Sequence, residues 1–123
     1  MISSERRIMD SFYSKVAGVT HKNKDGSSRQ ELIQRFVVEG QPLIFVPEPE
    51  NKFDPNSIAV YVDGWKPFRT VRVQIGYLEA RVAEELQSSL QSGEKISGIV
   101  TAITGGDHGK VHGVNIQITI ESK

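Results

Sequence analysis

The segment over residues 47–56 (PEPENKFDPN) holds the residues with the clearest chemical potential, Phe53 and Asp54. Phe53 is an aromatic residue in an otherwise polar segment, which Pro49 and Pro55 stiffen on both sides. A rigid loop with one exposed ring can stack a splayed base, and such stacking is worth about 1–3 kcal/mol per base. The Asp54 carboxylate repels phosphate but accepts a hydrogen bond from a hydroxyl. The pair therefore suits the end of a nucleic-acid strand that has a hydroxyl in place of a phosphate, which is a 3′ end.

Two amides in the same segment, Asn51 and Asn56, can donate hydrogen bonds to phosphates or base edges. A structural interpretation stays open, because Asp-Pro-Asn is a favourable turn sequence. In that interpretation Asp54 caps its own backbone and Phe53 packs into the core. The residue types alone do not decide between the two.

The distribution of charge is more informative than its sum. Fifteen basic and fifteen acidic residues cancel over the chain, whereas a nonspecific binder of nucleic acid is normally basic overall. Residues 15–35 hold five basic and two acidic side chains, and residues 66–81 hold four basic and one acidic. Residues 39–54, between them, hold one basic and four acidic side chains. If the fold brings the two basic stretches together, they form a local positive groove. The alternative is ordinary solvated charge.

Several classes of function find no support in the sequence. The chain has no cysteine, which rules out disulfides and thiolate metal sites and agrees with a reducing cytoplasm, where we expect the protein to act. Residues 1–10 contain no apolar run of the kind found in signal peptides, and no stretch approaches the length of a membrane span. We therefore expect no membrane partner.

Signatures of enzymes are also missing. Residues 105–110 (GGDHGK) lack the spacing of a phosphate-binding loop, and no Gly-x-Ser-x-Gly elbow occurs. His108 and His112 stand four apart, but glycines at 106, 109 and 113 argue against the helix that would point both at one metal. A metal-dependent enzyme at these histidines is the weakest hypothesis. We expect no catalysis, no cofactor, no metal and no small-molecule substrate.

The hydrophobic pattern predicts a mostly β chain. Leucine or valine recurs every fourth residue from Leu78 to Leu90, which predicts an amphipathic main helix over residues 79–92. Alternation over residues 114–120 predicts a half-buried strand. About six short strands, no repeat and one interrupting helix favour a small OB-like, partly open β-barrel.

The remaining boundaries complete this prediction. We divide the chain into an N-terminal extension, residues 1–13, and a barrel domain, residues 14–123. The other predicted elements are a short helix over 3–12, a short helical segment over 29–36, a turn over 63–67, and strands over 14–20, 42–46, 57–62, 70–78 and 95–104.

A longer pattern includes these residues. The run PEPENKFDPNSIAVYV, then QIGYL before the main helix, is similar to the HIRAN domain, whose hallmark is E/D-P-x-N-x-(Y/F)-D-x-N-A-I-x-V followed by G-(H/Y)-(L/I). VAGVT, Arg29-Gln30-Glu31 and HGVNI resemble stand-alone bacterial members. The similarity spans residues 14–121. The matching positions are Glu48, Pro49, Asn51, Phe53, Asp54, Asn56, Ile58, Val60, Gly76, Tyr77 and Leu78.

The resemblance implies an OB-like barrel that captures the 3′-hydroxyl end of single-stranded DNA. By matching position it implies that Phe53 stacks on a base, that Asp54 accepts the terminal hydroxyl, and that Asn51 adds a polar contact. It implies that Tyr77 lines the groove. It also implies a setting in DNA repair, replication or mobile elements, with a helicase or nuclease as partner protein.

The chain departs from this pattern at two places. End-binding members close the first strand with a basic residue and two aromatics, and here those positions are Thr20, His21 and Lys22. His21 can stack and Lys22 can meet a phosphate. A basic residue before the acid–proline pair is replaced by Pro47. Two or three phosphate contacts remain, which predicts roughly tenfold weaker binding between 50 and 200 mM salt.

A protein-interaction module is the second hypothesis. It keeps the barrel, loses DNA binding, and uses Trp65 and Phe68 in the segment GWKPFRTVR as its contact surface. An equally open alternative is that these two rings cover the open end of the barrel.

Overall fold

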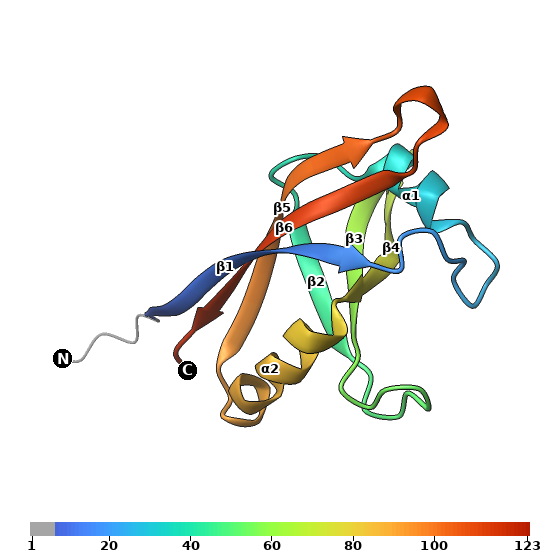
Figure 1. Cartoon of the computed structure of the whole chain (residues 1–123). Helices are drawn as coiled ribbons and strands as arrows, with labels where there is room; N and C mark the ends of the chain where they lie inside the picture. Colours follow the sequence, from blue (N-terminus) through green and yellow to red (C-terminus); the bar gives the residue numbers. More distant parts are fainter. Residues whose placement is uncertain (1–6) are drawn as a thin grey trace.

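The computed structural model describes residues 7–123 and contains six strands, two α-helices and one short 3-10 turn (Figure 1). The predicted helical segment over 29–36 and the main helix are both present. The elements are β1 (Ile8–Ala17), α1 (Arg29–Phe36), β2 (Pro42–Pro47), β3 (Ile58–Lys66), β4 (Arg69–Leu78), α2 (Ala80–Gln91), β5 (Lys95–Gly105), η1 (Asp107–Gly109) and β6 (His112–Glu121).

The strands form a closed antiparallel barrel in the order β1-β4-β3-β2-β5-β6, with β6 returning to β1. The mostly β fold is thus confirmed, and the barrel is closed where we expected it to be partly open. Closure is narrow between β1 and β4, where Val16 pairs with Leu78 and Ala17 pairs with Tyr77. Among residues 7–123, no other strand pairs with that edge of β4.

The core follows from the period of the strands. Val114, Ile116 and Ile118 of β6 are all essentially inaccessible to solvent, and the residues between them are half-buried. Because successive side chains of a strand point to opposite faces, this alternation gives β6 one apolar face toward the barrel interior. The pattern predicted over residues 114–120 is therefore confirmed.

The two helices lie near opposite ends of β3. The Ser28 hydroxyl caps α1 by accepting a hydrogen bond from the Glu31 amide, and Ile33 and Phe36 of α1 are buried. α2 lies near the other end, where the Gln87 side chain donates to the carbonyl of Asn56 just before β3. α2 is thereby bonded to the end of the loop over residues 48–57.

The first strand begins earlier than predicted. The part of the predicted helix over 3–12 that falls on residues 8–12 is wrong, because these residues belong to β1, and residues 3–6 lie outside the described part of the chain. β1 pairs with β6 from Ile8, opposite Glu121, to Lys15, opposite Asn115. Residues 8–13, assigned above to an extension, are thus held by backbone pairing within the barrel.

The predicted turn over residues 63–67 is also wrong. β3 continues to Lys66, and a two-residue turn at Pro67 and Phe68 leads into β4. Gly64 is in the strand for a packing reason: a Cβ there would lie 2.3 Å from the ring of Phe36 in α1. Asp-Gly therefore resembles a turn signal while serving a helix–strand contact.

None of the helices in the described part of the chain is long and apolar enough to span a membrane.

Candidate nucleic-acid interface

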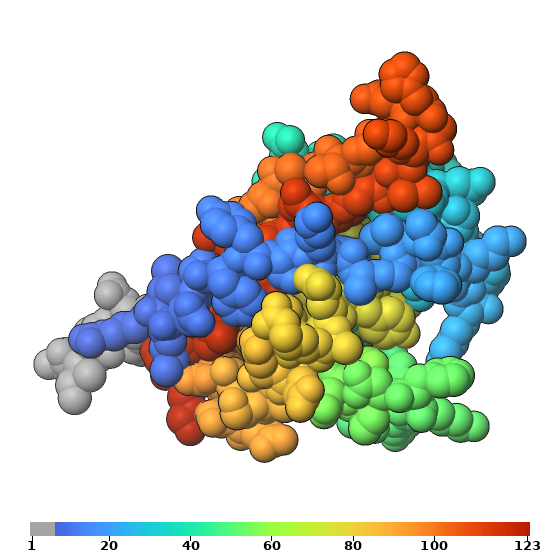
Figure 2. Space-filling model, viewed as in Figure 1, coloured from blue at the N-terminus to red at the C-terminus, as the bar shows by residue number. Residues whose placement is uncertain are grey.

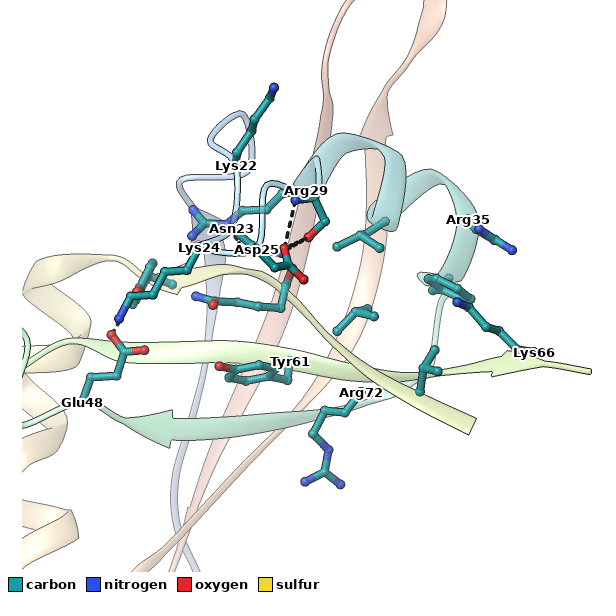
Figure 3. A pocket seen from close by; sticks show the side chains of 17 residues that line it. Lys22, Asn23, Lys24, Asp25, Arg29, Arg35, Glu48, Tyr61, Lys66 and Arg72 are labelled. Carbon is teal, nitrogen blue, oxygen red and sulfur yellow. Dashed lines mark hydrogen bonds between the residues drawn. The ribbon is translucent and has the colours of Figure 1, made fainter. Parts of the chain in front are cut away.

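A groove of about 690 Å³ lies between the loop over residues 18–28, α1, and strands β3 and β4 (Figure 3). Both basic stretches of the sequence contribute to it, which confirms that the fold brings them together. Six cationic side chains line the groove against two carboxylates. The cations are Lys22, Lys24, Arg29, Arg35, Lys66 and Arg72, and the carboxylates are Asp25 and Glu48.

Arg29, the first residue of α1, is the one charged side chain in residues 7–123 that is buried, at 7% exposure. Its Nε donates to Asn23 Oδ1 at 2.7 Å and its Nη1 donates to the Gly18 carbonyl at 2.9 Å. Its guanidinium lies over the Tyr77 ring, 5.3 Å from the centroid. All of these partners are neutral, so the buried positive charge stays uncompensated at the groove.

The aspartates in and near the groove form hydrogen bonds with other residues. Asp25 accepts hydrogen bonds from the backbone amide and hydroxyl of Ser27, which lower the pKa of Asp25. Asp63 forms a salt bridge with Arg72 at 2.9 Å, and that hydrogen bond lowers the pKa of Asp63. In residues 7–123 the only other ion pair joins Arg81 to Glu85. Arg72 is thus neutralised, while the lysines of the groove stay unpaired.

Tyr77 lies at the junction of the groove and the proline-rich loop, as the resemblance implies. Its hydroxyl donates to Glu48 Oε1 at 2.9 Å, and the same oxygen accepts a hydrogen bond from Asn51 Nδ2 at 3.0 Å. Burial raises the pKa of Tyr77 above its ordinary value of 10.0, and the hydrogen bond to Glu48 acts in the same direction. One carboxylate therefore connects the loop over residues 48–57 to the wall of the groove.

Asn51 and Asp54 shape this loop from within. Asn51 Oδ1 accepts the backbone amides of Phe53 at 2.9 Å and Asp54 at 3.2 Å. Asp54 Oδ1 accepts the backbone amide of Asn56 at 2.9 Å. The structural interpretation, in which Asp54 caps its own backbone, is therefore correct for one oxygen of Asp54. Within residues 7–123, Asp54 Oδ2 forms no hydrogen bond, and the side chain is partly exposed.

Phe53 is fully exposed. The alternative that Phe53 packs into the core is therefore wrong. The ring does not line the groove itself; it stands on the loop beside it, and this loop and the loop over residues 18–28 project from the same side of the molecule (Figure 2). A ring held out by hydrogen bonds at the base of its loop is available for stacking.

The other predicted site residues divide into two groups. Lys22 is exposed and lines the groove. His21 is also exposed but does not line it, and the Asn56 carbonyl is bound to Gln87 of α2. The structure therefore brings together Lys22 and Tyr77, with Asn51 one hydrogen bond away through Glu48.

Five cationic residues of the groove were absent from the predicted site: Lys24, Arg29, Arg35, Lys66 and Arg72. The signal that could have found them is the excess of basic residues over 15–35 and 66–81. That count located the charge but not which side chains converge, since convergence depends on α1 packing across the end of the β3–β4 hairpin.

The two other aromatic candidates are exposed as well. Trp65 is 82% exposed and Phe68 is fully exposed. The alternative that they cover an open end of the barrel is therefore wrong. In the described residues no group of three His, Cys, Asp or Glu side chains is placed to hold a metal ion.

Comparison with known proteins places this fold in a family. The model for the HIRAN domain matches residues 9–122. The HIRAN domain of human HLTF aligns with a TM-score of 0.65 and 17% identity, covering 99% of this chain and 84% of that one. A protein from Lactobacillus plantarum aligns with a TM-score of 0.62 and 17% identity, covering 97% and 98%. At 17% identity, the similarity of this chain to these two structures shows a shared fold and nothing further. A comparison with curated proteins finds no match.

Proposed function

The chain belongs to the HIRAN domain family, and from this premise we propose that it is a non-catalytic module that binds single-stranded DNA at a free 3′-hydroxyl end. We place it in the cytoplasm, in DNA repair, replication or mobile-element machinery, beside a helicase or nuclease.

The observation that carries the proposal is the uncompensated charge of the groove. Arg29 is buried among neutral partners, while Lys22 and Lys24 are exposed on the neighbouring loop. A buried cation without a carboxylate partner favours the arrival of an anion. Exposed lysines add an attraction for phosphates that salt weakens. A chain of zero net charge therefore offers a local site for a polyanion.

The terminal nucleotide is assigned to the loop over residues 48–57. Phe53 supplies an exposed ring on which a base can stack. The hydrogen bond from the Asn56 amide holds the Asp54 carboxylate in place and leaves its second oxygen to accept the 3′ hydroxyl. A 3′ phosphate in the same position would meet the charge of Asp54, so end chemistry determines affinity.

Fluorescence anisotropy tests this proposal with a short 5′-labelled oligonucleotide that ends in a 3′ hydroxyl or a 3′ phosphate. We expect the hydroxyl to bind about tenfold more tightly or better, because a hydrogen bond to a charged group is worth about 1.5–3 kcal/mol. Asp54→Asn should remove this preference. Asp107→Asn, which changes an exposed carboxylate on the β5–β6 hairpin, is the matched control and should keep it.

Phe53→Ala tests the stacking ring in the same assay. Binding of both oligonucleotides should weaken about fivefold or more, in line with about 1–3 kcal/mol for a stacked base. Phe68→Ala removes an equally exposed ring elsewhere and should bind like the wild type. Equal affinity for the two end groups, or no binding at low salt, would refute end recognition.

The exposure of Trp65 and Phe68 favours a second candidate function, a module that binds another protein. Rings exposed on one hairpin are typical of contact surfaces. Loss of DNA binding at low salt would favour this candidate.

A further inference from the structure

A second groove of about 510 Å³ adjoins the basic one. The two grooves share Arg35 and Phe36 at the end of α1. The second continues past the loop after α1 to Trp65 near the tip of the β3–β4 hairpin. The surface is thus hollowed from Tyr77 to Trp65, well beyond the size of one terminal nucleotide.

Arg35 marks the junction of the grooves. It is exposed, its guanidinium lies 5.1 Å from the centroid of the Phe36 ring, and it forms no ion pair among residues 7–123. The ring holds the guanidinium without neutralising it. An unpaired cation therefore stands where a strand leaving the first groove would enter the second.

The carboxylates of the second groove are Glu39 and Asp63. Asp63 is paired with Arg72, which offsets its charge. Glu39 is exposed to solvent, where its repulsion is screened. The remaining lining is suited to a base: Trp65, at 82% exposure, presents its indole at the end of the route.

We propose that the second groove binds the nucleotides 5′ of the strand end, with Arg35 contacting the backbone and Trp65 stacking on a base. This inference rests on the proposed function and extends it to the length of strand that the protein covers. It assigns a role to a groove that end recognition leaves unused.

The distance involved fits a strand of several nucleotides. Tyr77 of β4 pairs with Ala59, and Thr70 of β4 pairs with Trp65. Because β4 has one extra residue in this span, we count along β3, where Trp65 is six residues from Ala59; at about 3.3 Å each, the two sites lie about 20 Å apart along the hairpin. Barrels of OB type cover about 4–16 nucleotides of single strand. A trinucleotide would fill the end site alone, whereas a decanucleotide would reach Trp65.

The test compares 5′-labelled dT3 and dT10, both with a 3′ hydroxyl, by anisotropy at low salt. Wild type should bind dT10 about five- to fiftyfold more tightly than dT3, since one stacked base and one phosphate contact are added. Trp65→Ala should remove most of this gain and leave dT3 unchanged. Arg35→Gln should flatten the salt dependence of dT10 binding by about 0.7 in log–log slope. Phe68→Ala, a ring on the same hairpin outside both grooves, is the matched control.

The outcomes distinguish a failure of this inference from a failure of the proposed function. Equal affinities for dT3 and dT10, or a dT10 gain that survives Trp65→Ala, would overturn the second groove and leave end binding intact. A loss with Phe68→Ala as large as with Trp65→Ala would also overturn it, because the hairpin rather than the groove would then be the contact. Failure of both oligonucleotides to bind would refute the proposed function and the inference with it.

Discussion

At the scale of single residues, Arg29 shows how a cation can be buried and still serve a ligand. The Asn23 amide oxygen and the Gly18 carbonyl hold its guanidinium, and the Tyr77 ring lies beneath it. None of these partners cancels its charge. Arg72, in contrast, forms a salt bridge with Asp63, which offsets its charge. The attraction of the groove for phosphate therefore depends on neutral partners as much as on the number of cations.

The first prediction concerns Arg29→Met. The substitution keeps much of the packing but leaves Asn23 Oδ1 without its donor, while the Gly18 carbonyl keeps the hydrogen bond from the His21 amide. The free energy of unfolding should fall by about 1–3 kcal/mol, the cost of leaving one buried acceptor unsatisfied. Urea denaturation measures it. Arg29→Lys should lose less, and a Met variant as stable as the wild type would show that these bonds are unimportant.

The second prediction concerns Tyr77 and pH. Burial raises the pKa of Tyr77 in the folded state, so folding favours the neutral phenol. The resulting contribution to stability is complete below the ordinary pKa of 10.0 and is lost as the pH rises through the higher folded value. Denaturation at about pH 8 and about pH 11 should show a smaller pH dependence for Tyr77→Phe than for the wild type. An identical dependence in both proteins would contradict this account.

At the scale of elements, the sequence predicted the helices and strands that have a strong hydrophobic periodicity. The alternation of β6 and the four-residue spacing of α2 appear in the structure because each has one buried face. The first half of β1 was missed because Ile8, Met9 and Tyr13 are exposed, so no alternation marks it. Backbone pairing with β6, hydrogen bonds of the Ser11 side chain and the packing of Phe12 against the core hold it, and the pairing leaves no signal in residue types.

The third prediction concerns the seam between β1 and β4. A Cβ at Gly76 would lie 2.3 Å from the Ala17 carbonyl oxygen, so Gly76→Ala must push the two strands apart. The free energy of unfolding should fall by about 2–4 kcal/mol from this clash and the backbone conformation together. Gly109→Ala, which meets nothing within 4 Å but also has positive φ, should cost only about 1 kcal/mol. Equal losses in urea denaturation would show that close packing at the seam is unimportant.

At the scale of the whole molecule, a net charge of zero conceals a strongly uneven surface. The sequence located two basic stretches, and the fold places them along one groove. The family resemblance implied that Tyr77 lines the groove, as it does, whereas the residue types left open whether Phe53 is exposed or buried. The sequence could not show that Asn51 and Asp54 share their hydrogen bonds with their own loop, nor that His21 stands outside the groove, because both depend on loop conformation.

The fourth prediction follows from this surface. With two or three phosphate contacts, the log–log slope of binding against salt should lie near −1.4 to −2.1 for a short oligonucleotide, which is roughly tenfold between 50 and 200 mM. Lys24→Gln should reduce the slope by about 0.7. Lys95→Gln, at the start of β5 and outside the groove, should leave it unchanged. A slope near zero would mean that the cations of the groove do not meet phosphates.

The short pairing between β1 and β4 also links the binding of a ligand in the groove to local opening of the barrel. The Gly18 carbonyl and the Tyr77 ring stand on its two sides, and both hold Arg29. An anion that fixes Arg29 should therefore stabilise this short β1–β4 pairing. Amide protons of Ala17 and Tyr77 should exchange with deuterium faster than those of the long β5–β6 ladder in the free protein, and should slow selectively once a strand is bound.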